Sequence, residues 1–163
     1  ITFLGISYAE MKPEADLDNF RGMKWGMDIN KLPESDFVKT SGPSSKSEYF
    51  QRKSEDLDVL GVKATDIRYE FRNNQFYAVT IFFNISIKDE LRESLIGYLG
   101  KPNKVERKDL SLYLTWKGNN VWISEVINFR NDFIFIYIHS FAATKAEVKN
   151  NELSIKDKIK KGF

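Results

Sequence analysis

Hydrophobic and polar positions between residues 65 and 100 predict a strand, a tight turn, a second strand and a helix, in that order. Residues 66–72 alternate between apolar and charged side chains, which is the period of a strand with one face in solvent. Asn73-Asn74 comes next. Because asparagine tolerates positive φ, this pair predicts a two-residue type I′ hairpin.

The predicted hairpin fixes a register in which Phe71 lies opposite Phe76 and Tyr69 lies opposite Ala78. The return strand, 75–83, is apolar at both odd and even positions. We therefore expect a central strand that is covered on both faces or carries a β-bulge.

A helix over residues 87–99 is predicted by apolar side chains that recur every three or four positions. Ser86 and Asp89 form a weakened capping box at its start. Gly100 is placed for the C′ position, and Pro102 prevents the helix from continuing.

Beyond the helix the pattern is that of strands. Apolar side chains alternate through 110–138 and are interrupted by turn sequences at Gly118-Asn119 and Asn131-Asp132, which predicts a three-stranded antiparallel meander. Two-residue turns would pair Trp116 with Val121 and Ile127 with Ile136.

The expected fold class is α+β: a twisted antiparallel β-sheet, made of the hairpin and the meander, with one main helix packed on one face. Further short strands are expected at 36–39, 49–53 and 57–60. A chain of 163 residues suits one domain. We divide it into a signal-peptide remnant, an irregular N-terminal segment, a single α+β domain, and a short helix with a lysine-rich tail: 1–9, 10–19, 20–140 and 141–163.

Residues 1–9 have the features of the end of a secretory signal peptide. An apolar stretch leads to Ser7-Tyr8-Ala9, which has the small-x-small form of a signal-peptidase site. The alternative is a short N-terminal strand. No later stretch approaches the ~20 apolar residues of a membrane span, so we expect no transmembrane segment and a periplasmic or secreted location.

Three segments resemble those of small exported bacterial proteins of uncharacterised function. They are Phe20-Arg21-Gly22-Met23-Lys24-Trp25-Gly26, Tyr69-Glu70-Phe71 and Gly100-Lys101-Pro102. The resemblance spans roughly residues 20–139. It implies export, and it implies no activity and no catalytic residues.

Composition narrows the chemistry. The chain has no cysteine, which excludes disulfides and thiol catalysis, and its net charge of +2 gives no reason to expect a nucleic-acid partner. His139 is the only histidine, no Gly-x-Ser-x-Gly motif occurs, and zinc sites usually need three or four ligands. Asp16-x-Asp18 begins like a calcium loop but lacks the acid that such a loop needs at its twelfth position. We expect no metal and no cofactor.

Glu125 is the most unusual titratable residue, because the register places it on the apolar face between Ile123 and Ile127. A carboxylate there has to be paired or becomes easier to protonate. We expect an ion pair with an arginine such as Arg68 or Arg130, or a bulge that turns Glu125 outward. The alternative is a catalytic acid.

The opposite face of the predicted meander carries aromatic and polar side chains. The residues proposed for binding there are Trp122, Phe135, Tyr137 and His139, with Glu125 as a fifth candidate and Trp25, Trp116 and Tyr113 as further aromatic members. Such a surface is either a binding patch or core packing.

The expected function is that of an exported, non-catalytic domain of the cell envelope that binds a protein, a peptide or an envelope component through its sheet face or an edge. One alternative is a carboxylate-based hydrolase that uses Glu125. The other is an adaptor that contacts anionic lipid through its tail lysines: Lys156, Lys158, Lys160 and Lys161.

Overall fold

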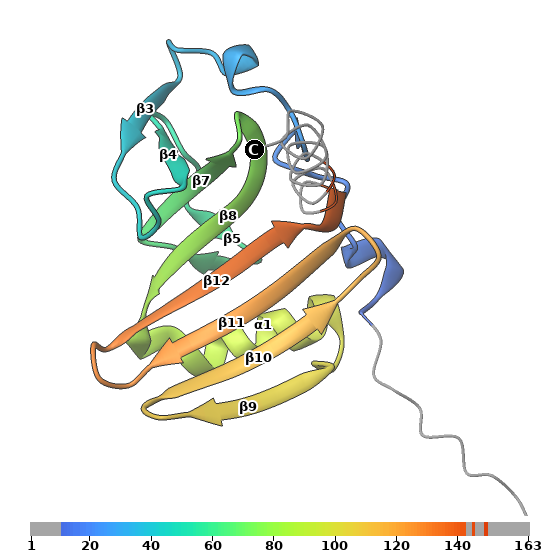
Figure 1. Cartoon of the computed structure of the whole chain (residues 1–163). Helices are drawn as coiled ribbons and strands as arrows, with labels where there is room; N and C mark the ends of the chain where they lie inside the picture. The colour runs from blue at the N-terminus through green and yellow to red at the C-terminus, as the bar shows by residue number, and fades with distance from the viewer. Residues whose placement is uncertain (1–10, 143–144, 146–148, 150–163) are drawn as a thin grey trace, which may run out of the picture.

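The structure, a computed structural model, describes residues 11–142, 145 and 149. Its main feature is one eight-stranded sheet, in the order β3-β4-β7-β8-β12-β11-β10-β9, in which all neighbours are antiparallel (Figure 1). The strands are β3 (Phe37–Thr40), β4 (Ser47–Arg52), β7 (Asp66–Arg72), β8 (Gln75–Asn84), β9 (Lys104–Lys108), β10 (Ser111–Lys117), β11 (Val121–Asn128) and β12 (Phe133–Ser140).

The remaining elements are small apart from one helix. The helix α1 (Lys88–Leu99) lies behind β10 and β11 in the view of Figure 1. Two short hairpins are separate from the main sheet: β1 (Asn19–Phe20) with β2 (Met23–Lys24), and β5 (Asp58–Val59) with β6 (Val62–Lys63). Single 3₁₀ turns cover Pro13–Ala15, Ile29–Lys31 and Ile85–Ile87. The predicted antiparallel sheet with one helix on one face is confirmed, although the sheet dominates the fold.

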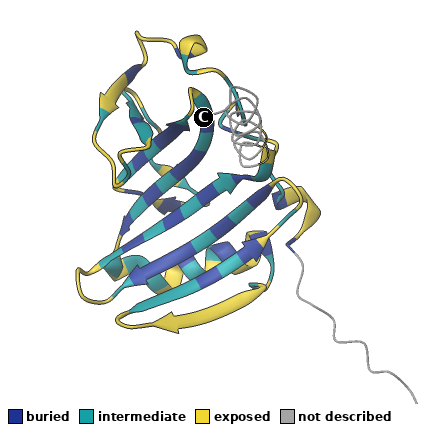
Figure 2. Ribbon diagram, viewed as in Figure 1, coloured by how far each residue is buried: buried dark blue, intermediate teal, exposed yellow. Residues whose placement is uncertain are grey.

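The core lies between α1 and the sheet. Leu91, Leu95 and Leu99 form the buried stripe of the helix and pack against isoleucines of β8, β11 and β12. In Figure 2 buried and exposed positions are mixed along α1, and buried positions alternate with half-buried ones along the central strands. Trp116 is fully buried, and its indole Nε1–H donates to the carbonyl of Gly100 at 2.9 Å. This bond fixes the end of the helix against β10.

The helix ends are as predicted, with one change at the start. Gly100 has φ +90° and follows Leu99 directly, so it terminates the helix as expected. At the other end no side chain caps α1 itself. Asn84 caps the preceding 3₁₀ turn instead, and its side-chain oxygen accepts from the backbone N–H of Ser86. The turn that precedes α1 is held by this bond.

The hairpin between β7 and β8 has the predicted turn and an added bulge. Asn73 and Asn74 both have positive φ, as a type I′ turn requires, and Phe71 pairs with Phe76. The expected pairing of Tyr69 with Ala78 is wrong, because the register shifts after Glu70 and leaves Tyr77 as an extra residue of β8.

This bulge explains why β8 is apolar at both odd and even positions. Phe76 lies in the core on one side of the bulge, and Val79, Ile81 and Phe83 lie in the same core on the other side. The bulge therefore moves the core face from even to odd positions along a single strand.

The meander is present, but both of its registers differ from the prediction by two residues. Trp116 pairs with Ile123 instead of Val121, and Ile127 pairs with Ile134 instead of Ile136. In the second turn the side-chain oxygen of Asn128 accepts hydrogen bonds from the backbone N–H groups of Arg130 and Asn131. The turn therefore begins earlier in the chain than expected. A shift of two keeps every side chain on its predicted face.

The sheet extends beyond the predicted hairpin and meander at both edges. On one side β4 pairs with β7, and β3 pairs with β4. On the other side β9 pairs with β10, although all five of its residues are exposed. Its sequence, Lys-Val-Glu-Arg-Lys, has no apolar alternation to identify it, and its charges suit an unprotected sheet edge.

The N-terminal segment is tied to the far end of the meander by Asp16. Its Oδ2 accepts from the N–H of Asn119 at 2.8 Å, and its Oδ1 accepts from Asn120 and Val121 at 2.9 and 3.2 Å. A Cβ on Gly118 would lie 2.2 Å from Oδ1, so only glycine permits this approach. The calcium-like Asp16 is therefore a cap on the β10–β11 turn.

Two predictions fall outside the described residues: the signal-peptide remnant at 1–9 and the lysines of the tail. None of the helices in the described part of the chain has the length and apolar character needed to cross a bilayer.

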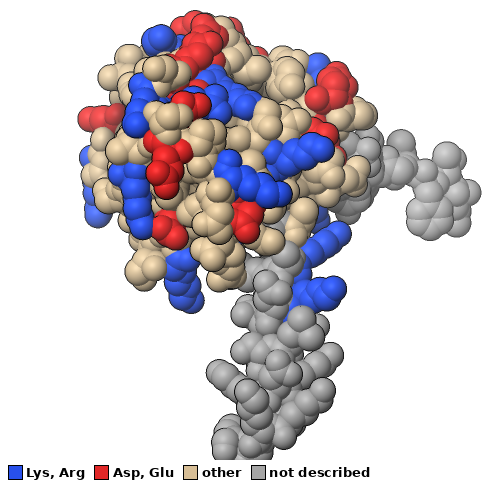
Figure 3. All heavy atoms as spheres, turned by 90° about the horizontal axis from the view of Figure 1, so that it is seen from above, with Lys and Arg blue, Asp and Glu red and all other residues tan. Residues whose placement is uncertain are grey.

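Figure 3 shows acidic and basic side chains interspersed over the face seen there, with neither charge dominating.

Replacing the Asp16 cap provides a test of the fold. We expect Asp16→Ala to lower the free energy of unfolding by about 1.5–3 kcal/mol, because three backbone donors lose a charged acceptor. Asp18→Ala is the matched control, since Asp18 is exposed and, within the described part of the chain, its carboxylate accepts a hydrogen bond only from the neighbouring Asn19. This variant should change stability by less than about 0.5 kcal/mol. Urea denaturation of both variants is the measurement. Equal effects would show that Asp16 is not a cap.

Candidate functional site

The face of the sheet opposite α1 carries the candidate site, and we call it the open face. In β12 alternate residues are buried against the core, and those between them, which point to the open face, are half-buried. No helix of the described residues covers this side, which faces the viewer in Figure 1. Antiparallel sheets usually present polar side chains on a solvated face, whereas this one presents Phe, Tyr, Trp and His.

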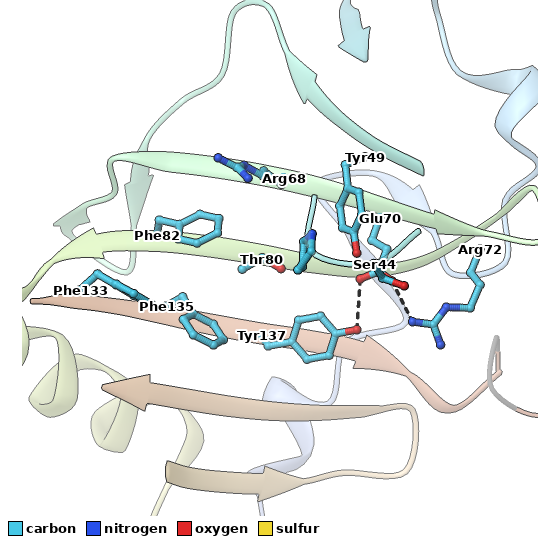
Figure 4. Close-up of a pocket in the computed structure, with 11 residues that line it drawn as sticks. Ser44, Tyr49, Arg68, Glu70, Arg72, Thr80, Phe82, Phe133, Phe135 and Tyr137 are labelled. Atoms are coloured by element: carbon cyan, nitrogen blue, oxygen red, sulfur yellow. Dashed lines mark hydrogen bonds and ion pairs between the residues drawn. The ribbon is translucent and has the colours of Figure 1, made fainter. Parts of the chain in front are cut away.

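A groove of about 560 Å³ crosses the open face. Its floor is formed by β7, β8 and β12, and the loop between β3 and β4 overhangs it (Figure 4). The lining residues are Pro43, Ser44, Tyr49, Arg68, Glu70, Arg72, Thr80, Phe82, Phe133, Phe135 and Tyr137. One end is therefore aromatic and apolar, and the other is polar.

Glu70 organises the polar end. Glu70 is buried, with its side chain 4% exposed, and its carboxylate accepts hydrogen bonds from three side chains. Oε1 accepts from Ser47 Oγ at 2.6 Å and from Arg72 Nη2 at 2.9 Å, and Oε2 accepts from the Tyr137 hydroxyl at 3.2 Å. The donors come from β4, β7 and β12, so one carboxylate joins three strands. Ala78 lies opposite Glu70 on β8, and its small side chain leaves room for this bridge.

The acid–base state of this cluster follows from its burial. Burial raises the pKa of the Tyr137 hydroxyl, and the neighbouring Glu70 carboxylate raises it further. Burial and Glu70 likewise raise the pKa of Tyr49. Both phenols are therefore neutral at physiological pH and serve as fixed hydrogen-bonding groups, not as bases.

The overhanging loop lies directly against Tyr49, and this close approach is possible because Gly42 has no side chain. A Cβ added to Gly42 would lie 2.0 to 2.3 Å from ring atoms of Tyr49. The loop backbone thus packs directly on the ring, and this contact fixes one wall of the groove.

Four of the five residues predicted for binding lie on the open face. Phe135 and Tyr137 line the groove. His139 and Trp122 lie beside it, opposite each other in the register of β11 and β12, with ring centroids 5.9 Å apart. His139 also stacks on the bulge residue Tyr77 at 6.1 Å. His139 makes no hydrogen bond within the described part of the chain and serves as part of an aromatic stack.

The fifth, Glu125, lies on the other face of the sheet beneath α1. It is fully buried, and its Oε2 accepts from Nε and Nη2 of Arg92 on the helix at 3.2 and 3.1 Å. The expected ion pair exists, but its partner is neither Arg68 nor Arg130, because the helix and not a strand covers this position. Burial raises the pKa of Glu125, and Arg92 opposes the shift. A carboxylate sealed beneath an arginine is unsuited to catalysis in the groove.

Two tryptophans proposed for the aromatic surface serve other purposes. Trp116 is in the core. Trp25 stacks on Phe76 at 4.7 Å and donates to the carbonyl of Leu17 at 3.0 Å, on the side of the core. Tyr113 does lie on the open face, in the same cross-strand row as Phe135, but outside the groove.

Comparison with protein-family models, curated proteins and solved structures finds no match. The resemblance to small exported bacterial proteins stays a prediction.

Sequence reasoning missed Glu70 and Arg72. Their alternation in β7 indicated a solvent face, and nothing local shows that Ser47 and Tyr137 converge on Glu70 from 23 and 67 residues away. In the sequence, Glu70 is not distinguished from the other charged side chains of β7, which alternate with apolar ones.

Among the described residues that line the groove, there are hydrogen-bonding groups but no nucleophile paired with a free general base. The hydroxyl of Ser47 donates to Glu70, which is already occupied by Arg72 and Tyr137. Among the described residues, no group of three His, Cys, Asp or Glu side chains is placed to hold a metal ion. The arrangement is suited to binding.

The Glu125–Arg92 pair gives a stability prediction. Arg92→Leu leaves a buried carboxylate without its counter-charge and should cost about 3–5 kcal/mol at pH 7. The double variant Arg92→Leu with Glu125→Leu should recover most of that loss, because the charge is gone as well. Chemical denaturation measures both. A single-variant cost below about 1 kcal/mol would mean that Glu125 is solvated or already protonated.

His139 gives a pH prediction. Burial lowers the pKa of this imidazole, Arg72 lowers it further, and Glu70 opposes them. His139 thus releases its proton more readily in the folded state than in the unfolded state, where a histidine has a pKa of about 6.5. Neutral His139 therefore contributes its full stabilisation when the pH is above the pKa of the unfolded state. This contribution is lost as the pH falls through the pKa of His139 in the folded state.

We therefore expect the wild type to lose stability relative to His139→Phe between pH 7.5 and pH 5, in urea denaturation at matched pH values. The phenyl ring preserves stacking on Tyr77 and Trp122, so it isolates the proton. Parallel stability–pH curves would contradict the inference.

Proposed function

We propose that this protein is a non-catalytic binding domain whose ligand occupies the groove on the open face of its sheet. The observation that carries the proposal is the groove itself: aromatic side chains at one end and a prearranged cluster around Glu70 at the other. Its volume of about 560 Å³ falls within the range of sites for small molecules or short peptide segments.

The rigidity of the polar end supports binding. Hydrogen bonds to the Glu70 carboxylate already fix the side chains at this end: Ser47, Arg72 and Tyr137. A ligand would therefore not have to order them. The loop that overhangs the groove is likewise fixed through Gly42 and Tyr49. Prearranged walls of this kind reduce the entropic cost of binding.

Aromatic side chains supply the apolar contact. Phe82 and Phe135 lie opposite each other on β8 and β12, with ring centroids 6.1 Å apart. The ring of Phe133 is next along β12, and its centroid lies 5.9 Å from that of Phe135. All three are only half-buried, so each has area available to a ligand. Large aromatic side chains in a recess supply much of the energy of recognition.

The test is a ligand screen by NMR on the ¹⁵N-labelled full chain. Small acids, bases, neutral aromatics and short peptides are titrated, and amide shifts are mapped on the structure. We expect binders to shift the amides of Thr80, Phe82 and Phe135, and we expect Phe135→Ala to weaken them by about tenfold, since an aromatic anchor is lost.

Tyr113→Ala is the matched control, because Tyr113 lies on the same face outside the groove. It should leave the affinities unchanged. Binding that maps elsewhere, or that survives Phe135→Ala at full strength, would refute the proposed site. Turnover of a bound compound would refute the non-catalytic reading.

A further inference from the structure

A polar row crosses the groove between its aromatic residues. Arg68 on β7 pairs with Thr80 on β8, and Thr80 pairs with Tyr137 on β12. Thr80 is half-buried on the floor of the groove, and its hydroxyl has no hydrogen-bond partner within the described part of the chain. The row therefore offers an unused donor beside a guanidinium group.

Arg68 is held in place but keeps donors free. Its Nε donates to Asp66 at 2.8 Å, its Nη1 donates to the carbonyl of Ser41 at 3.3 Å, and its guanidinium lies 4.9 Å from the centroid of the Phe82 ring. Figure 4 shows it above Phe82 at the rim of the groove. Guanidinium has five N–H donors, so the outer edge formed by Nη1 and Nη2 still has donors for a ligand.

The charged groups most exposed in the groove are the guanidinium groups of two arginines. The side chain of Arg68 is 31% exposed and that of Arg72 is 24% exposed, whereas that of Glu70 is 4% exposed. Both oxygens of Glu70 are occupied by protein donors. Asp66, the partner of Arg68, binds Nε and Gln51 and does not line the groove. Among the described lining residues, a ligand therefore meets guanidinium donors and no carboxylate that lacks a protein partner.

Resting on the proposed function, we infer that the groove binds small carboxylic acids with an aromatic or alkyl body. The carboxylate is bound by Arg68 and the hydroxyl of Thr80. The apolar body lies along Phe82, Phe133 and Phe135. Planar guanidinium matches carboxylate geometry with two parallel hydrogen bonds, which gives preference over amides and amines of the same shape.

The experiment uses three probes that differ only in the head group: 4-phenylbutyrate, 4-phenylbutyramide and 4-phenylbutylamine. Each is titrated into the ¹⁵N-labelled full chain at low salt, and affinities and shift maps are compared. The carboxylate should shift the amides of Arg68, Thr80 and Phe135. It should bind at least about tenfold more tightly than the amide, and the amine should bind more weakly still.

Arg68→Met should reduce the affinity for the carboxylate to that of the amide and leave the amide unchanged. Arg68→Lys should retain part of the preference, because it keeps the charge and loses the planar fork. Arg130→Met is the control, since Arg130 is exposed on a turn outside the groove, and it should alter nothing. Thermal melting confirms that each variant is folded.

The outcomes separate the two proposals. Binding of the amide or amine in the groove as tightly as the carboxylate overturns the ligand class and leaves the proposed function intact. The same conclusion follows if none of the three probes binds in the groove but other compounds in the screen do. If no compound of either set binds in the groove, the proposed function fails, and the inference fails with it.

Discussion

The buried carboxylate of Glu70 determines how the open face is built. A charge removed from water costs several kcal/mol unless it is paired and hydrogen-bonded. Here the compensation comes from Ser47 on β4, Arg72 on β7 and Tyr137 on β12. Because the donors lie on three different strands, Glu70 connects the polar end of the groove to the pairing of β4 with β7.

The bulge in β8 makes this arrangement compatible with a continuous core. It places Tyr77 beside the guanidinium of Arg72, at 4.0 Å from ring centroid to the guanidinium carbon, and brings Ala78 opposite Glu70. A larger residue at Ala78 would fill the space that Glu70 crosses to reach Tyr137. On the other face the same bulge keeps Phe76 and Val79 together in the core. One irregularity therefore serves both sides of the sheet.

The parts of the fold that could be predicted are those encoded locally. The Asn73-Asn74 turn, the helix ending at Gly100 and the alternation of the meander each depend on residues close together in the chain, and each is present. The registers of the meander were wrong by two because the turns are capped by side chains outside the turn sequences considered: Asp16, about a hundred residues away, and Asn128. Strand β9 was missed because an edge strand needs no apolar face.

The candidate site was predictable only in part for a related reason. Phe135, Tyr137 and His139 alternate with the isoleucines of β12, and Trp122 alternates with Val121 and Ile123 in β11, so periodicity predicts one face for all four; the structure places them there. Glu70, Arg68 and Arg72 share a parity as well, but in sequence they are indistinguishable from a solvated polar face. Only the packing of β4 and β12 beside β7 and β8 converts that face into a groove.

The central claim is that Glu70 joins the strands of the open face, and a double-mutant cycle tests it most directly. Glu70→Ala, Tyr137→Phe and the double variant are compared with the wild type by urea denaturation at pH 7. We expect a coupling free energy of about 1 kcal/mol or more between the two positions, because each variant removes the same charged hydrogen bond. Additive effects, with a coupling indistinguishable from zero, would contradict it.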